Sequence, residues 1–189
     1  MQALAQDLGH LLGSRDQYII PRFQRYYDWK SDNREKLWND IVDVAFDGSS
    51  SHSHFFGSIV AIPTIHQMGK VTPYLVIDGQ QRLTTVSLLL LAIRDIARSR
   101  GHNDDADKVE DLYLVHKHEF DNDHFRLLML PADLDSSCTR LHAFVEYFHL
   151  LLGRETPSRC HAAAPGQSSS LCLILCIAMD ADSLTVCSQ

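Results

Sequence analysis

The chain has 189 residues, of which 45% are hydrophobic, and a formal net charge of −7. This length suits one ordinary domain, or one domain with a tail, and the hydrophobic content excludes a wholly disordered chain. A general basic coat for nucleic acid is absent, so any DNA contact has to be local. No signal peptide is recognisable, and no apolar stretch approaches the roughly 20 residues that span a bilayer. These features predict a soluble, cytoplasmic protein with no membrane partner.

The chain before the central helix is predicted to alternate between helices and strands. In chain order these elements are a helix over residues 3–12, a strand over 18–20, a helix over about 33–47, and strands over 54–62 and 74–77. The helix over about 33–47 is predicted from the helical spacing of its apolar residues, with Leu37, Trp38 and Ile41 facing inward. Ser31 or Asp32 is its predicted N-cap. The strand over 74–77 is apolar throughout, as expected when both faces are covered.

The chain after residue 80 is dominated by one strongly periodic helix over about 81–98. Its apolar residues recur at spacings of three and four, which predicts a central position in the core. A polar loop over 101–108, a helix over about 109–118, a strand over 125–130 and a helix over 138–152 follow. The acidic residues between 104 and 135 are interpreted as a solvated face.

A change of character near residue 157 predicts a domain boundary. We expect one domain over 1–156 and a divergent, Cys-rich tail over 157–189, which is disordered, a linker into a missing domain, or an out-of-frame end. Four of the five cysteines lie in this tail, so the main domain is expected to be reduced and intracellular. Cys172 and Cys176 lack the second pair that a zinc site needs.

The most informative stretch is VIDGQQRLTT, from Val76 to Thr85. It ends an apolar run, turns at Gly79 and opens the periodic helix. Backbone N–H groups at a helix start carry partial positive charge, and the planar fork of Arg82 can grip phosphate oxygens. The carboxylate of Asp78 can hold a metal ion or polarise a water. The stretch thus predicts a phosphate or nucleotide site; the alternative is a simple turn in which Arg82 pairs with a nearby acid.

The neighbouring residues leave further alternatives open. The side-chain amides of Gln80 and Gln81 can orient a water or read a base edge, because an amide both donates and accepts hydrogen bonds. Gly79 is expected to adopt a backbone shape that other residues resist. Asp78 has helix capping as its alternative role. The histidines lack a carboxylate at a recognisable spacing, so no histidine metal site is expected.

Three segments in order resemble one family. These are IPRFQRYYDW (Ile20–Trp29), HFFGSIV (His54–Val60) and VIDGQQRLTT. The combination resembles the N-terminal domain of the GmrSD family of restriction endonucleases, over roughly residues 10–150. The resemblance implies a compact α+β domain similar to the ParB and sulfiredoxin fold, with a small mixed sheet and several helices.

The resemblance also implies a function. In the family this domain is associated with nucleotide binding and hydrolysis, coupled to DNA cleavage by a C-terminal HNH-type nuclease in defence against phage with modified DNA. A nucleoside triphosphate and Mg²⁺ are therefore the expected ligands, with Asp78 holding the metal and Asp78, Gln81 and Arg82 as the catalytic residues. The implied nucleotide-binding residues are Pro21, Gln24, Arg25, Asp78, Gly79, Gln80, Gln81 and Arg82.

The chain departs from the family pattern near residue 155, and it shows no His-Asn-His arrangement. DNA cleavage is thus expected from a nuclease domain or subunit supplied elsewhere. Two alternatives remain at this point. One is a non-catalytic DNA-binding or sensing module, in which Arg82 contacts a DNA phosphate and the stretch from Arg22 to Lys30 supplies charge and aromatic rings. The other is an inactive, truncated remnant.

Overall fold

The fold is a six-stranded mixed sheet with helices, in a computed structural model that describes residues 4–21, 27–46, 54–65, 70–129, 145–147, 150 and 184–188. The α+β class predicted from the sequence is confirmed. In chain order the elements are β1 (Leu4–Asp7), α1 (Leu8–Gly13), β2 (Asp16–Ile20), α2 (Ser31–Phe46), β3 (His54–Pro63), β4 (Thr72–Asp78), α3 (Gln80–Ser99), α4 (Asn103–Val109), the π-helix η1 (Glu110–Leu114), the 3-10 helix η2 (Asp121–His124), β5 (Leu127–Met129) and β6 (Leu184–Ser188).

The sheet has the strand order β1-β6-β3-β4-β2-β5. Strand β2 runs parallel to both of its neighbours, so that Ile19 lies beside Leu75 of β4 and Ile20 lies beside Met129 of β5. Strand β3 is antiparallel to β4. Because β5, β2 and β4 are parallel and in this register, all three strands end at the same edge of the sheet. Helix α3 begins at that edge, one residue after β4.

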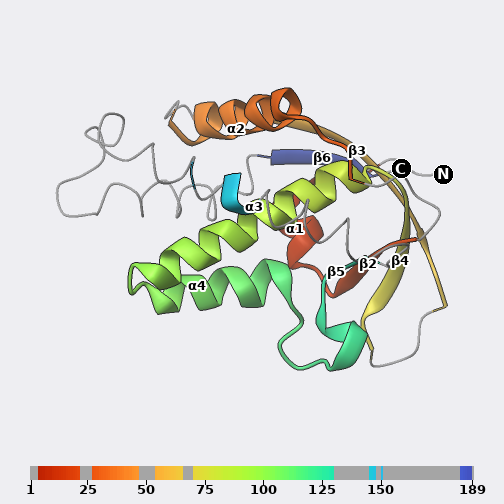
Figure 1. The fold of residues 1–189 in the computed structure, drawn as a ribbon. Coiled ribbons are helices and arrows are strands. Elements are labelled where there is room, and N and C mark those ends of the chain that lie inside the picture. The colour runs from red at the N-terminus through yellow and green to blue at the C-terminus, as the bar shows by residue number, and fades with distance from the viewer. Residues whose placement is uncertain are drawn as a thin grey trace.

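Helix α3 crosses the middle of the molecule between α2 and α4, with most strands to the right of the helices in this view (Figure 1). Its buried residues recur at the predicted helical spacing and include Leu83, Val86, Leu89 and Ile93. The predicted central position of this helix is confirmed. Burial of such side chains removes apolar surface from water, which is the main term that stabilises the core.

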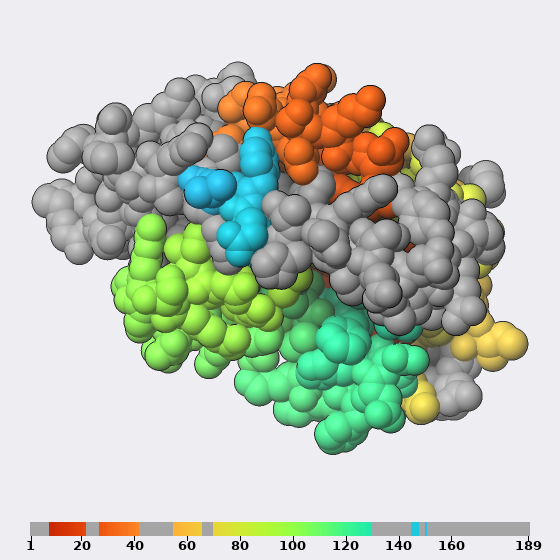
Figure 2. All heavy atoms as spheres, in the orientation of Figure 1, coloured from red at the N-terminus to blue at the C-terminus, as the bar shows by residue number. Residues whose placement is uncertain are grey.

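Helix α2 covers the core from the other side through Leu37, Trp38 and Ile41, which are all buried as predicted. Further along the chain, the helical residues 145–147 pack against the same core, and the Arg34 guanidinium lies 4.8 Å from the ring centre of Tyr147. In the space-filling view this short segment, in cyan, lies between α2 in orange and α3 in green (Figure 2).

The segment from η1 to β5 is tied to the start of β2 by the side chain of Arg126. This buried guanidinium donates to three backbone carbonyls, those of Val115 at 3.1 Å, Asp111 at 3.2 Å, and Ser14. Burial lowers the pKa of Arg126, because desolvation penalises its charge. Three carbonyl acceptors offset that penalty, so Arg126 serves as a structural cross-link.

Three sequence predictions about the elements are corrected. Of the helix predicted over residues 3–12, only the part from Leu8 onward is helical, because Leu4–Asp7 pairs with β6 as a strand. The polar loop predicted over 101–108 is instead α4, which buries Ala106 and Val109 against α3. The helix predicted over 109–118 is the π-helix η1 and ends at Leu114. For β1 and α4, contacts with another segment, β6 and α3 respectively, outweigh the local polarity pattern.

The later predictions are met in part. The strand predicted over 125–130 is present as β5, shortened to Leu127–Met129. Of the helix predicted over 138–152, only 145–147 and 150 are among the described residues, and they are helical. In the region predicted to be a divergent tail, β6 pairs with β1 and β3. The division into 1–156 and 157–189 stays a prediction. Among the described residues, no helix is both long and apolar enough to cross a bilayer.

Candidate functional site

The motif from Asp78 to Arg82 forms a tight corner between β4 and α3. Gly79, the N-cap of α3, has a φ of 89°, in the left-handed region that favours glycine. A Cβ atom at this position would lie 3.0 Å from the Ile59 Cγ1 atom and 3.1 Å from the Ser58 carbonyl oxygen. The predicted special backbone shape of Gly79 is therefore confirmed. Only glycine fits both the conformation and the space.

Pro21, the one described residue of the first implied segment, lies at the same sheet edge as this corner. Pro21 follows the end of β2 and is buried, while Asp78 ends the neighbouring parallel strand β4. Parallel strands place their carboxyl ends at one sheet edge, which is where open α/β sheets bind ligands. Pro21 and the Asp78–Arg82 corner thus lie at the same edge. Gln24 and Arg25, the other two residues implied from this segment, lie outside the described residues.

Tyr27 and Asp28 also contact this corner. The backbone N–H of Asp28 donates to the Gln81 Oε1 atom at 3.0 Å. The Tyr27 hydroxyl lies 2.7 Å from the Thr85 Oγ1 atom, and this threonine hydroxyl donates to the Gln81 carbonyl. Tyr27 is therefore the donor to Thr85. Burial raises the pKa of Tyr27 well above its ordinary value, so this hydroxyl keeps its proton at neutral pH.

Arg82 lies against a glycine in β3. Its Nη1 atom donates to the Ser58 carbonyl at 2.9 Å, and its Nε atom lies 2.8 Å from the position that a Cβ atom of Gly57 would occupy. Gly57 has a φ of 106° at a register shift of β3. Within the described part of the chain Arg82 forms no ion pair, so its alternative role as the partner of Asp78 or Asp28 is not seen there.

Gly57 and Ser58 are site residues that the sequence reasoning missed. Their signal was the glycine inside the apolar strand HFFGSIV, since a glycine within a strand often marks a bulge or a close backbone approach. In this chain the close approach is made by the guanidinium of Arg82.

The other motif residues differ in exposure. Asp78 is exposed at the surface, Gln81 and Arg82 are half-buried, and Gln80 is buried. No side chain among the described residues caps the N-terminus of α3. The corner therefore presents the positive end of a 20-residue helix beside one half-buried cation and one exposed carboxylate.

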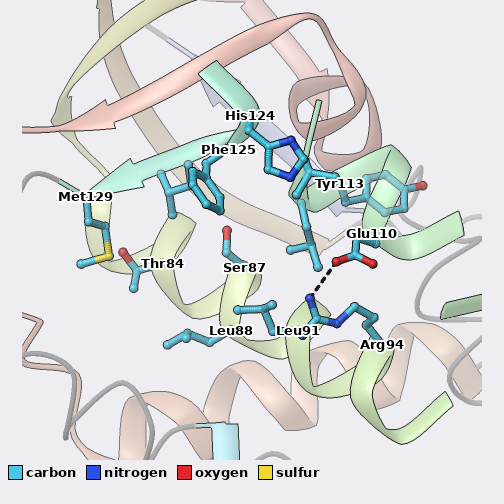
Figure 3. Close-up of a pocket in the computed structure, with 13 residues that line it drawn as sticks. Thr84, Ser87, Leu88, Leu91, Arg94, Glu110, Tyr113, His124, Phe125 and Met129 are labelled. Carbon is cyan, nitrogen blue, oxygen red and sulfur yellow. Dashed lines mark hydrogen bonds and ion pairs between the residues drawn. The ribbon is translucent and has the colours of Figure 1, made fainter. Parts of the chain in front are cut away.

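A cavity of about 390 Å³ lies along α3. It runs between α3 and the segment from η1 to β5, with Thr84 and Met129 at one end and Arg94 and Glu110 at the other (Figure 3). Its walls are mainly apolar. Sequence reasoning did not identify this cavity, because its two walls come from separate segments of the chain, α3 and the stretch from η1 to β5.

These features define an α+β domain in which a strand-to-helix corner places the N-terminus of α3 beside Arg82. Residues 8–161 match the family model of the GmrSD restriction endonuclease N-terminal domain. The chain therefore belongs to this family, and the resemblance stated from its motifs is confirmed. Membership places it in the context of a restriction system for phage defence. A comparison with curated proteins finds no match.

Proposed function

We propose that this domain binds a nucleoside triphosphate at the corner between β4 and α3 and hydrolyses it within a restriction system. One observation carries the proposal. The parallel strands β2 and β4 end at the edge where α3 begins, so Pro21 and the Asp78–Arg82 motif share one corner. A single ligand can contact the segment of Pro21 and the segment from Asp78 to Arg82 only if the two lie at one corner, as they do here.

The corner suits a chain of phosphates for electrostatic reasons. The N-terminus of α3 supplies partial positive charge and backbone N–H groups that point out of the helix. Arg82 adds a full charge, and its contacts with Gly57 and Ser58 hold the guanidinium in place before any ligand arrives. A guanidinium has five N–H donors, so one bond to Ser58 leaves donors for phosphate oxygens. Such preorganised donors favour the charge that develops during phosphoryl transfer.

Asp78 fits the role of the metal-holding residue. Mg²⁺ is commonly bound through one or two carboxylates together with the phosphates of its nucleotide, and Asp78 offers an exposed carboxylate at the corner. When bound there, the ion would neutralise phosphate charge. Gln81 would position water through its amide group, because its side-chain oxygen already accepts the N–H of Asp28.

The test is calorimetric titration of the protein with ATP, GTP and CTP in the presence of Mg²⁺, followed by phosphate release. Arg82→Lys keeps the charge but loses the planar fork, and we expect it to weaken binding about tenfold or more. Asp78→Asn should reduce hydrolysis more strongly than binding. Arg100→Ala is the matched control, since Arg100 is an exposed arginine at the opposite end of α3.

Two results would overturn the proposal. The first is unchanged nucleotide affinity and turnover in Arg82→Lys. The second is a folded wild-type protein that binds none of the three nucleotides. If that protein instead bound duplex DNA with a steep salt dependence, the DNA-sensing alternative would replace nucleotide hydrolysis.

A further inference from the structure

The cavity along α3 has the size and lining of a small-molecule site. Its volume of about 390 Å³ lies within the range of ligand pockets, roughly 300–1,000 Å³. Leu88 and Leu91 of α3 form one wall, and Phe125 and Leu127 form the opposite wall. The Phe125 side chain is 48% exposed, although it is a large aromatic ring at the mouth of an apolar cavity. Such a ring is a platform on which a flat ligand can stack.

The polar groups of the cavity favour a neutral ligand over an anionic one. Arg94 is already paired with Glu110 at 3.1 Å and with Asp95 at 2.7 Å. A phosphate or carboxylate at that end would face the Glu110 carboxylate and an arginine whose charge is already paired. At the other end, the hydroxyl groups of Thr84 and Ser87 form no hydrogen bond within the described residues. Hydroxyls both donate and accept, which suits the mixed polar edge of a heterocycle.

The Phe125 ring is held in place by its neighbours. His124 packs edge-on against it, with ring centres 5.3 Å apart and an angle of 80° between the planes. The His124 ring is itself held by a contact between its Nδ1 atom and the Glu119 carbonyl at 3.2 Å. Figure 3 shows the Ser87 hydroxyl pointing toward the Phe125 ring from the other wall. A flat ligand between them would meet a ring on one side and a hydroxyl on the other.

The hydroxyl end of the cavity lies toward the N-terminus of α3, because Thr84 is the first residue of this helix that lines it. Thr84 is four residues after Gln80, which is about 6 Å along the helix axis. On the opposite wall Met129 ends β5 and lies beside Ile20 of β2, the residue before Pro21. Both walls of the cavity therefore reach the sheet edge at which the corner forms. A ligand with phosphates at the N-terminus of α3 could extend into the cavity through a unit the size of one sugar.

From this placement of the cavity walls we infer that the cavity is the nucleobase subsite of the proposed nucleotide site. The base stacks on Phe125, the Ser87 hydroxyl lies on the other side of the base, and the Thr84 hydroxyl meets its polar edge. The triphosphate lies at the Asp78–Arg82 corner. This inference rests on the proposed function and adds to it where the base is held.

The test compares three probes on the full chain: the nucleoside triphosphate that binds best, the corresponding nucleoside, and inorganic triphosphate. Ser87→Leu fills the cavity without touching the corner, and Ser99→Leu is the matched control on the exposed end of the same helix. We expect the Kd of the nucleotide to rise about tenfold or more in Ser87→Leu, because stacking of the base is lost. The Kd of inorganic triphosphate should not change, and Ser99→Leu should behave as wild type.

A second variant guards against misfolding. Phe125→Leu removes the ring at a half-exposed position, and we expect it to weaken nucleotide and nucleoside binding while leaving inorganic triphosphate unaffected. Circular dichroism and Tm confirm that each variant is folded.

The two hypotheses fail in different ways. If wild type binds the nucleotide but neither cavity variant changes its Kd, the base lies elsewhere and the inference is wrong, while the proposed function stands. If wild type binds neither the nucleotide nor inorganic triphosphate, the proposed function fails and takes the inference with it. Equal affinity of wild type for the nucleotide and for inorganic triphosphate would also overturn the inference.

Discussion

Arg82 and Arg126 both donate to backbone carbonyls, and they differ in how many N–H donors they keep for a ligand. Arg126 is 8% exposed and donates to three carbonyls, from Ser14, Asp111 and Val115. Arg82 is half-buried, and its single hydrogen bond within the described residues goes to Ser58. A buried guanidinium with its donors used is a structural cross-link. A guanidinium fixed by one contact at an open edge keeps the capacity to bind a ligand.

The largest expected effect comes from removing the structural arginine. Arg126→Leu leaves three backbone carbonyls without their donor, and each unsatisfied buried group costs about 1–3 kcal/mol. We expect the free energy of unfolding in urea to fall by about 3 kcal/mol or more. Arg100→Leu, at an exposed position, should change it by less than about 0.5 kcal/mol. A loss below about 1 kcal/mol in Arg126→Leu would mean that the cross-link contributes little.

The next effect tests the corner backbone. Gly79→Ala combines a left-handed conformation with a Cβ contact of 3.0 Å, and we expect a loss of about 2–4 kcal/mol. Gly101→Ala is the matched control, because its φ of 83° is similar but no atom lies within 4 Å of the added Cβ. That variant should lose only about 1 kcal/mol. Equal losses in thermal or urea unfolding would show that the close contact with Ile59 is relieved at no cost.

A smaller effect is expected at Tyr27, which contacts the corner through Thr85. Tyr27→Phe removes the hydrogen bond to Thr85 and should cost about 1 kcal/mol of stability. It should also weaken nucleotide binding, but less than Arg82→Lys, because that bond holds Tyr27 beside the corner. Tyr74→Phe serves as the control, since it alters a tyrosine of β4 that stacks on Tyr18. If Tyr27→Phe bound nucleotide as wild type does, the bond would be structural alone.

The smallest effect is a pH dependence near Arg126. His116 is buried, and burial together with the charge of Arg126 lowers its pKa below the ordinary 6.5. Glu119 and a hydrogen bond with the backbone of Asp16 raise the pKa of His116, whereas Arg15 lowers it as Arg126 does. The unfolded chain therefore takes up the proton first as the pH falls. Stability from this group is present above 6.5 and is lost as the pH falls through 6.5 toward the lower folded pKa.

Urea unfolding from about pH 8 to about pH 5 measures this dependence. His116→Gln should flatten the curve over this interval, whereas the same change at the exposed His118 should not. A curve that is unaltered in His116→Gln would assign the pH dependence to other groups.

Elements with a regular apolar pattern could be predicted from the sequence, whereas elements that depend on contacts with other segments could not. Helix α3, strands β3 and β4, and the inward face of α2 were predicted correctly, because each has a regular apolar pattern within a single segment. Strand β1 and helix α4 were not, since the first depends on pairing with β6 and the second on packing against α3. Local polarity does not record either contact.

The same division applies to the candidate site. The family, the strand-turn-helix corner and the need for glycine at position 79 can be predicted from the sequence, because adjacent residues make up that corner. The contacts of Arg82 with Gly57 and Ser58, those of Tyr27 and Asp28 with α3, and the cavity from Thr84 to Glu110 are visible only in the folded domain. These arrangements depend on strand register and helix packing, which join segments that no local pattern connects.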